Sequence, residues 1–357
     1  MIRVLVVDDS AVVRRVLSEG LGRYPDLQVV GHAQDPYVAR EKIVALRPDV
    51  MTLDVEMPRM DGLSFLAKVM QHRPMPVVVV SSLTPRGGEE ALRALALGAV
   101  EVICKPGSAY DVGDIAPRLA QAVRAAAAAK RIAPHVVFPP CGDKAPLAPL
   151  GRTSDHIIAL GASTGGTEAL RTVMAELPGD APGTVIVQHM PPAFTTSFAR
   201  SLDSISRMHV AEARGGERLQ PGLAFLAPGN HHLVVVRSGA QYHLEVREGP
   251  QVHFQRPAVD VTFHSLAKAA GANCVAALMT GMGQDGAAGL KALRDAGAHT
   301  ICQDEASSVV WGMPKAGIDC GAACDVAPLE QIAARLVTWS RRAGALTAPP
   351  ADAGRMP

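Results

Sequence analysis

The stretch Ile2-Arg-Val-Leu-Val-Val-Asp-Asp9 decides how the first part of this chain folds. A short, continuous apolar run predicts a β-strand that is buried on both faces. Amphipathic stretches separate it from four further runs of the same kind: Gln28 to Ala33, Val50 to Asp54, Val77 to Ser82 and Val100 to Cys104. This alternation predicts an α/β fold, with a five-stranded, doubly wound parallel sheet whose functional crevice lies at the carboxyl ends of the strands.

Polar residues stand where four of these strands end. Asp8 and Asp9 follow the first strand, Asp54 ends the third, Ser81 lies at the end of the fourth and Lys105 follows the fifth. Because parallel strands bring their carboxyl ends to one edge, we expect these five side chains to lie together. A single Asp at such a place more often caps a helix. Three carboxylates in register favour a site for Mg²⁺ instead, since they repel one another without a cation.

The motifs around these residues resemble those of two-component response-regulator receiver domains. They are Val6-Val-Asp-Asp-Ser10, Leu53-Asp-Val-Glu-Met-Pro58, Met60-Asp-Gly62 and Cys104-Lys-Pro106. The resemblance covers about residues 2–120 and implies a flavodoxin-like fold. It also implies that Asp54 accepts a phosphoryl group from a sensor histidine kinase of the CheA type and that Asp8, Asp9 and Asp54 hold Mg²⁺. Ser81 and Lys105 would then contact the phosphoryl oxygens.

The composition changes after the last helix of this region, which we expect to start near Asp114 and to run through the alanines at 125–129. Residues 131–153 contain five prolines and two glycines without hydrophobic periodicity, which predicts a semi-extended linker. We therefore expect a receiver domain over 1–124 and a linker over 125–153. A length of 357 residues with 48% apolar side chains leaves room for a second domain.

The α/β alternation resumes over residues 154–345. Buried strands are expected at His156 to Leu160, Thr184 to Val187, Cys274 to Met279 and Thr300 to Gln303. Two β-rich runs, His232 to Arg237 and Tyr242 to Arg247, flank a short turn and predict a hairpin inserted in an otherwise parallel sheet. The Pro-, Ala- and Gly-rich tail over 346–357 is expected to be disordered.

A G-x-S-x-G motif, Gly161-Ala-Ser163-Thr-Gly165, follows the first strand of this second region. Glycines on both sides of Ser163 permit a tight strand-to-helix turn that exposes the serine hydroxyl. A glycine-rich turn also binds phosphates or dinucleotides. The G-x-G-x-x-G spacing is missing, however, and the next strand ends in Gln188-His189 where a dinucleotide site needs an acidic residue. The pattern favours Ser163 as a nucleophile with His189 as its base.

Three carboxylates compete to orient that histidine. Asp285 lies in the glycine-rich loop from Leu278 to Gly286, directly after a buried strand. Asp304 also follows a buried strand but could equally cap a helix, and Asp260 lies within a stretch that looks helical. A strand end is the expected place for the third member of such a triad, which puts Asp285 first and leaves the other two as competitors.

The whole second region resembles the catalytic domain of the CheB family of chemotaxis protein-glutamate methylesterases. The matching motifs occur in order over roughly 154–342: Gly161 to Glu168, Gln188-His-Met-Pro-Pro192, Ala227-Pro-Gly229, Arg256-Pro257 with Val259-Asp-Val261, Thr280 to Gly286, and Gln303 to Ser307 with Gly312 to Lys315. The resemblance implies that Ser163 is the nucleophile, His189 the general acid and base and Asp285 the orienting carboxylate. It places the oxyanion donors at the amides of Thr164 and Met282 and implies no cofactor at the esterase site.

The same resemblance implies the function and its control. Glutamate γ-methyl esters on chemoreceptor cytoplasmic helices would be hydrolysed with release of methanol, and receptor glutamines deamidated, during chemotaxis adaptation. Phosphorylation of Asp54 would activate the enzyme. We expect the unphosphorylated receiver to pack against the Ser163 crevice and obstruct it, because a regulatory domain precedes a site that must admit a protein helix.

Charge and cysteine content exclude other classes. The net charge of +1 includes a basic excess only in the short segment 126–153, which argues against a nucleic-acid-binding domain. Six cysteines without a C-x-x-C pair fit free thiols in a reducing compartment. Since the start of the chain shows no signal-peptide pattern and no run suits a membrane span, we expect a cytoplasmic monomer without membrane insertion. A catalytically silent adaptor with the same fold is the alternative, and retention of Ser163, His189 and Asp285 argues against it.

Overall fold

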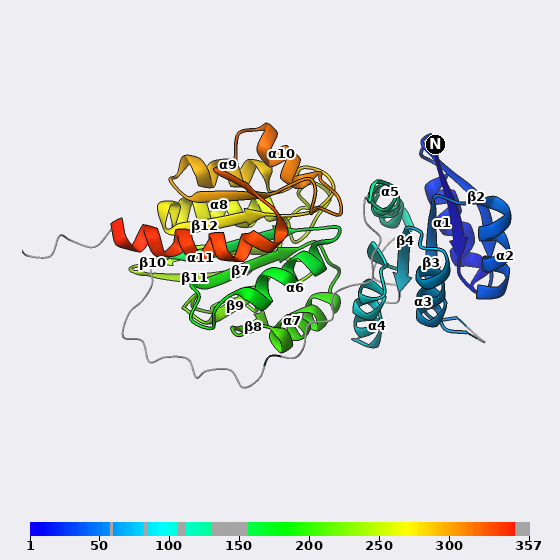
Figure 1. The fold of residues 1–357 in the computed structure, drawn as a ribbon, viewed down its shortest axis with the longest axis horizontal. Helices are drawn as coiled ribbons and strands as arrows, with labels where there is room; N and C mark the ends of the chain where they lie inside the picture. The colour runs from blue at the N-terminus through cyan, green and yellow to red at the C-terminus, as the bar shows by residue number, and fades with distance from the viewer. Residues whose placement is uncertain (58–59, 82–84, 106–111, 130–140, 142–155, 347–357) are drawn as a thin grey trace, which may run out of the picture.

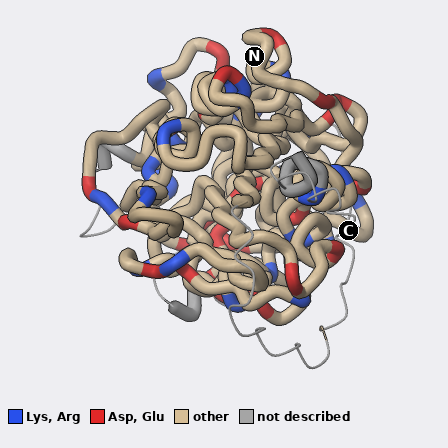
Figure 2. The backbone as a smooth tube through the Cα atoms, turned by 90° about the vertical axis from the view of Figure 1, so that its left-hand side faces the viewer, with Lys and Arg blue, Asp and Glu red and all other residues tan. Residues whose placement is uncertain are grey.

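The computed structural model describes residues 1–57, 60–81, 85–105, 112–129, 141 and 156–346. Figure 1 shows two α/β lobes side by side, the first coloured blue to cyan and the second green to red. Among the described residues, none of the helices combines the length and apolar character that crossing a membrane requires. Acidic and basic residues alternate along the backbone in the view of Figure 2 rather than forming a face of one sign.

The first lobe is the expected doubly wound sheet. Its strands are β1 (Ile2–Val7), β2 (Leu27–Ala33), β3 (Val50–Asp54), β4 (Val77–Ser81) and β5 (Glu101–Cys104), all parallel in the order β2-β1-β3-β4-β5. Its helices are α1 (Ala11–Leu21), α2 (Pro36–Leu46), α3 (Gly62–His72), α4 (Pro85–Ala96) and α5 (Val112–Ala128). Every residue of β3 and β4 is buried, which explains their unbroken apolar runs. The strand order reverses between β1 and β3, so the crevice opens beside their carboxyl ends.

Helix α5 continues to Ala128, so the first four residues of the expected linker are helical. Residues 130–140 and 142–155, which make up most of that linker, lie outside the described residues, as does the tail from 347 onward.

The second lobe contains a seven-stranded sheet, parallel throughout, in the order β14-β13-β12-β6-β7-β9-β8. Its strands are β6 (Ile157–Ala162), β7 (Gly183–Gln188), β8 (His209–Glu212), β9 (Leu223–Leu226), β12 (Cys274–Leu278), β13 (His299–Gln303) and β14 (Asp325–Ala327). The sequence did not predict β8, β9 or β14. Strands β8 and β14 lie at the sheet edges with one buried residue each, so no continuous apolar run marks them. Strand β9 is an apolar run with three buried residues, but at four residues it is too short to stand out.

Helices cover both faces of this sheet (Figure 1). They are α6 (Gly166–Glu176), α7 (Phe194–Ile205), α8 (Val259–Ala269), α9 (Ala287–Asp295), α10 (Met313–Asp319) and α11 (Leu329–Leu346), with a short 3₁₀ turn at Gly271–Asn273. Alternate strand residues separate the two cores: Ile158 packs with the apolar residues of α6, α7 and α11, and Ile157 with those of α8 and α9.

The expected hairpin is present, but it lies outside the parallel sheet. Strands β10 (His232–Ser238) and β11 (Gln241–Arg247) pair with each other, antiparallel, across a two-residue turn. His243 of β11 also forms an isolated antiparallel bridge with Arg218, which lies outside the parallel sheet. Hydrogen bonds from Thr262 and to Ser265 attach β10 to α8. The apolar side of the hairpin is therefore buried against α8 rather than against neighbouring strands of the parallel sheet.

The two lobes contact each other through α4 and α5 of the first. Helix α4 packs on α7. A Cβ atom at Gly88 would lie only 2.9 Å from Ser197 Oγ, so this contact between the helices leaves no room for a side chain at position 88. One apolar cluster includes buried residues of both lobes. The receiver lobe thus lies against the edge of the second sheet at which the motif residues are found.

Candidate active site

Ser163 lies in the sharp turn between β6 and α6. Gly165 in this turn has φ +77°, a conformation that favours glycine. Gly161 approaches α8 so closely that a Cβ would lie 2.4 Å from a Val259 methyl group. The turn is closed by a 2.6 Å bond from the Gly166 amide to the Ser163 carbonyl. These glycines explain how the serine is held at the end of the strand.

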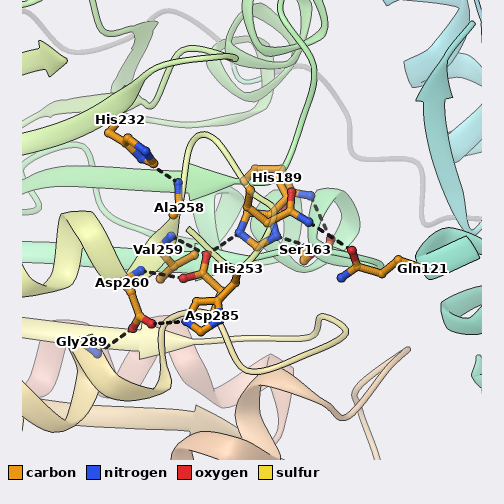
Figure 3. Close-up of polar contacts among 12 residues, drawn as sticks. Gln121, Ser163, His189, His232, His253, Ala258, Val259, Asp260, Asp285 and Gly289 are labelled. Atoms are coloured by element: carbon orange, nitrogen blue, oxygen red, sulfur yellow. Dashed lines mark hydrogen bonds and ion pairs between the residues drawn. The ribbon is translucent and has the colours of Figure 1, made fainter. Parts of the chain in front are cut away.

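Ser163, His189 and Asp285 form one hydrogen-bonded line (Figure 3). His189 follows β7 directly, and its Nδ1 lies 3.0 Å from Ser163 Oγ. Its Nε2 lies 2.7 Å from Asp285 Oδ2. All three residues are buried. With its proton on Nε2, the imidazole donates to Asp285 and can accept the serine proton at Nδ1.

Asp285 receives two backbone amides besides the histidine. The first turn of α8 provides both: the Val259 amide donates to Oδ2 at 2.7 Å and the Asp260 amide to Oδ1 at 3.0 Å. Burial alone would raise the pKa of Asp285, but the hydrogen bond and charge of His189, together with the two amides, lower it below its ordinary value. The carboxylate is therefore ionised at neutral pH and stabilises a protonated His189.

The two competing carboxylates have other partners. Asp260 accepts a hydrogen bond from the Gly289 amide and pairs with His253 Nε2 at 3.0 Å. Asp304 accepts from the amide and hydroxyl of Ser307. Of the three candidates, the geometry brings Asp285 to His189.

The amides of Thr164 and Met282 are among those at the site that donate no hydrogen bond within the described residues. The loops that carry them are tied together by Thr280, whose Oγ1 donates to the Thr164 carbonyl at 2.9 Å and accepts from the Val310 amide at 3.0 Å. The Ser163 amide in turn donates to the Thr280 carbonyl at 2.9 Å. Sequence reasoning missed Thr280, although its place directly before the Gly-Met-Gly loop was a usable signal.

The receiver lobe closes over this site. A cavity of about 40 Å³ is lined by Ser163, Thr164 and His189 from the second lobe and by Glu101 and Gln121 among others from the first. Glu101 Oε2 accepts a hydrogen bond from Thr164 Oγ1 at 2.5 Å. Burial raises the pKa of Glu101 to about 7, against the opposing effects of the Thr164 bond and of the charges on His189 and Arg118. Nothing in the sequence pattern singled out Glu101.

The acidic crevice of the first lobe also assembles as expected. Oxygen atoms of Asp8, Asp9 and Asp54 lie within 4.8 Å of one another. Lys105 Nζ lies 2.6 Å from Asp54 Oδ2 and 3.3 Å from Asp8 Oδ2. Ser81 is buried at the end of β4, and its carbonyl accepts from the Lys105 amide.

The charge of this crevice is incompletely balanced. Burial raises the pKa of Asp54 to about 6 although Lys105 opposes the shift, and Asp8 adds to it. Burial likewise raises the pKa of Asp8. The ion pair with Lys105 is the contact of Asp8 Oδ2, and the Ser81 hydroxyl has no hydrogen-bond partner within the described residues. A hard cation that binds oxygen ligands fits such a site.

Two family models match the chain. The CheB methylesterase model matches residues 158–336, and the response regulator receiver domain model matches residues 4–115. The solved catalytic domain of Thermotoga maritima CheB methylesterase is 37% identical and superposes with a TM-score of 0.50, covering 51% of this chain and 97% of that structure.

Curated relatives match over almost the whole length. One from Syntrophus aciditrophicus, named protein-glutamate methylesterase/protein-glutamine glutaminase 2, is 52% identical over 94% of this chain and 98% of its own. A relative of the same name from Pseudomonas aeruginosa is 52% identical over 96% of this chain and 98% of its own. The chain therefore belongs to the CheB methylesterase family, with a response-regulator receiver domain preceding its catalytic domain.

Proposed function

We propose that this protein is a phosphorylation-regulated protein-glutamate methylesterase that also deamidates glutamines. Its substrates are the cytoplasmic helices of methyl-accepting chemoreceptors, and it acts in the cytoplasm as a monomer. The line of hydrogen bonds from Ser163 through His189 to the buried Asp285 carries this proposal, because it is the arrangement that acyl transfer requires. We assign residues 1–124 to the receiver and 154–345 to the methylesterase domain, joined by 125–153.

The reaction follows from the geometry of the triad. His189 Nδ1 takes the hydroxyl proton as Ser163 Oγ attacks the γ-carbonyl carbon of the glutamyl ester. The amides of Thr164 and Met282 donate to the oxyanion that forms. When the carbonyl is restored, the methoxide leaves with the proton from His189 as methanol. Water, deprotonated by the same histidine, then hydrolyses the acyl-enzyme and frees the glutamate; a glutamine follows the same course with ammonia as the leaving group.

The receiver controls access to this site. The Glu101 carboxylate bonded to Thr164, together with Gln121, stands where a substrate side chain would enter. We propose that a CheA-type kinase phosphorylates Asp54 and that this shifts the two domains toward an arrangement with the site uncovered. Asp8, Asp9 and Asp54 would hold Mg²⁺, which neutralises charge on the transferring phosphoryl group. Ser81 and Lys105 would bond to the phosphoryl oxygens.

The decisive experiment measures methanol release from methylated chemoreceptors. We expect the Ser163→Ala variant to release none above the uncatalysed rate, because the acyl-enzyme cannot form. The exposed Ser238 in the β10–β11 hairpin provides a matched control, and Ser238→Ala is expected to retain wild-type activity. Equal methanol release by wild type and Ser163→Ala would refute the mechanism and favour a catalytically silent adaptor.

A further inference from the structure

A strained two-residue turn stands beside the Ser163 pocket. Val252 and Gln255 exchange both backbone hydrogen bonds, at 3.0 and 2.9 Å, and enclose His253 and Phe254. Both enclosed residues have positive φ, +51° and +61°. Turns of this kind normally contain Asn and Gly, because a Cβ atom is poorly tolerated in the left-handed region. Two bulky side chains in these positions are costly, and backbone strain of this sort is concentrated at functional sites.

Contacts on both sides hold the turn in place. His253 Nε2 lies 3.0 Å from Oδ2 of the buried Asp260, as Figure 3 shows. Arg256 donates through Nε and Nη2 to Asn230 Oδ1, and the Asn230 amide donates back to the Arg256 carbonyl. The turn therefore has one defined position relative to the triad, because Asp260 and Asp285 are linked through the first turn of α8.

Burial of the Phe254 side chain does not offset the backbone strain of this turn. The Phe254 side chain is 69% exposed, while the neighbouring Gln255 is buried and lines the same cavity as Ser163 and His189. Consecutive Cα atoms are about 3.8 Å apart, so the backbone of Phe254 lies directly beside a residue of the cavity wall. Gln255 Nε2 already reaches Gln121 of the receiver at 3.5 Å, yet Phe254 stays exposed. This aromatic ring is thus accessible while the receiver is docked.

We propose that Phe254 is a docking residue for the protein substrate and contacts an apolar side chain on the helix that carries the glutamyl ester. This inference rests on the proposed function. A glutamyl ester that reaches Ser163 brings its helix over the rim of the pocket. Residues three or four positions from that glutamate lie on the same helical face, with Cβ atoms about 5–6 Å away. An amphipathic helix has apolar residues at such spacings, and one of them would cover Phe254.

The test uses two substrates and the full-length chain. One is a helical peptide with a single glutamate γ-methyl ester and a leucine four positions away, and the other is a capped glutamate γ-methyl ester without a helix. For Phe254→Ala we expect KM for the peptide to rise about tenfold, as loss of a partly buried aromatic contact implies, with kcat unchanged. KM for the capped ester should not change. Phe254→Leu should restore most of the affinity for the peptide.

A matched control and a stability measurement complete the design. Tyr37 on α2 is a comparably exposed aromatic residue of the other lobe, and Tyr37→Ala should leave both KM values unchanged. Phe254→Gly should raise KM for the peptide as alanine does and also raise Tm, because glycine adopts the left-handed conformation without strain.

Two results would overturn the proposal. The first is an unchanged peptide KM in Phe254→Ala, and the second is an equal rise for both substrates. If KM is unchanged and the variant also loses a dimer that the wild type forms, the residue contacts a second copy of the chain instead. Failure of the wild type to release methanol from either ester would instead refute the proposed function itself.

Discussion

Asp54 and Asp285 are both buried carboxylates beyond the ends of parallel strands, yet their surroundings shift them in opposite directions. Asp285 receives His189 and two amides of α8, and its pKa is lowered. Asp54 has Lys105 but also burial and the neighbouring Asp8, and its pKa is raised to about 6. The triad is complete without further charge, as preorganised catalysis requires. In the receiver crevice, Lys105 alone does not balance three carboxylates, which suits a site that responds to a cation and a phosphoryl group.

The comparison predicts its largest effect at Asp285. Replacement with asparagine removes the negative charge and the acceptor that fixes the His189 tautomer, and we expect kcat to fall by about 10³- to 10⁴-fold. Steady-state methanol release measures this. Asp319→Asn, which removes an exposed carboxylate that pairs with Lys315, should leave kcat unchanged. A loss of less than tenfold at Asp285 would mean that the triad does not work as a unit.

The next largest effect is expected at Thr280, which ties together the loops carrying the two oxyanion amides. Thr280→Val keeps the shape but removes the hydroxyl, and kcat should fall about 10- to 100-fold with little change in KM, since misplaced donors weaken only the transition state. Thr280→Ser should recover most of the activity. Full activity in Thr280→Val with a loss in Thr280→Ser would show that the methyl group, rather than the hydroxyl, matters.

A smaller effect concerns Glu101, which belongs to the receiver but lies in the catalytic pocket. Its pKa of about 7 in the closed arrangement exceeds its ordinary value of 4.5, so the closed arrangement binds the proton more tightly. Closing is therefore favoured below pH 4.5 and becomes less favourable as pH rises to about 7. We expect the ratio of unphosphorylated to phosphorylated activity to rise severalfold over this range in the wild type.

Glu101→Gln provides the control for that pH dependence. The glutamine side chain cannot ionise, and taking the ratio of the two activities cancels any pH dependence of the chemical step, which both states share. The ratio in Glu101→Gln should therefore be flat between pH 5 and 7. A ratio that rises equally in wild type and variant would assign the pH dependence to another group.

The smallest expected effect is on thermal stability, where replacing Asp54 and replacing Asp285 should act in opposite directions. Because the pKa of Asp54 is raised, ionisation of Asp54 between about pH 4 and 6 costs stability. Asp54→Asn should raise the Tm of the receiver transition by a few degrees at pH 7 without Mg²⁺, whereas Asp285→Asn should lower that of the catalytic domain. Calorimetry on the full chain measures both, and a lower Tm for Asp54→Asn would contradict the account of an under-compensated crevice.

Strand ends explain how much of the site the sequence could predict. Strands β3, β6 and β7 are buried throughout, so their apolar runs placed Asp54, Ser163 and His189 at a strand end or within a few residues after one. Short edge strands such as β8 and β14 lack that signal. Glu101 could not be predicted, because it reaches Thr164 only through packing of one lobe on the other. The place of Thr280 before the Gly-Met-Gly loop could have marked it as a candidate, but its role depends on hydrogen bonds to residues far away in sequence, which a local pattern does not record.

The central claim is that the receiver covers the Ser163 site and that phosphorylation of Asp54 uncovers it. The most direct measurement is methanol release from methylated receptors by the full-length wild type and by Asp54→Asn, each with Mg²⁺ and with or without a small-molecule phosphodonor. The account predicts that the phosphodonor raises the rate at least tenfold in the wild type and leaves Asp54→Asn at its basal rate. An equal rate with and without the phosphodonor in a wild type shown to be phosphorylated would contradict it.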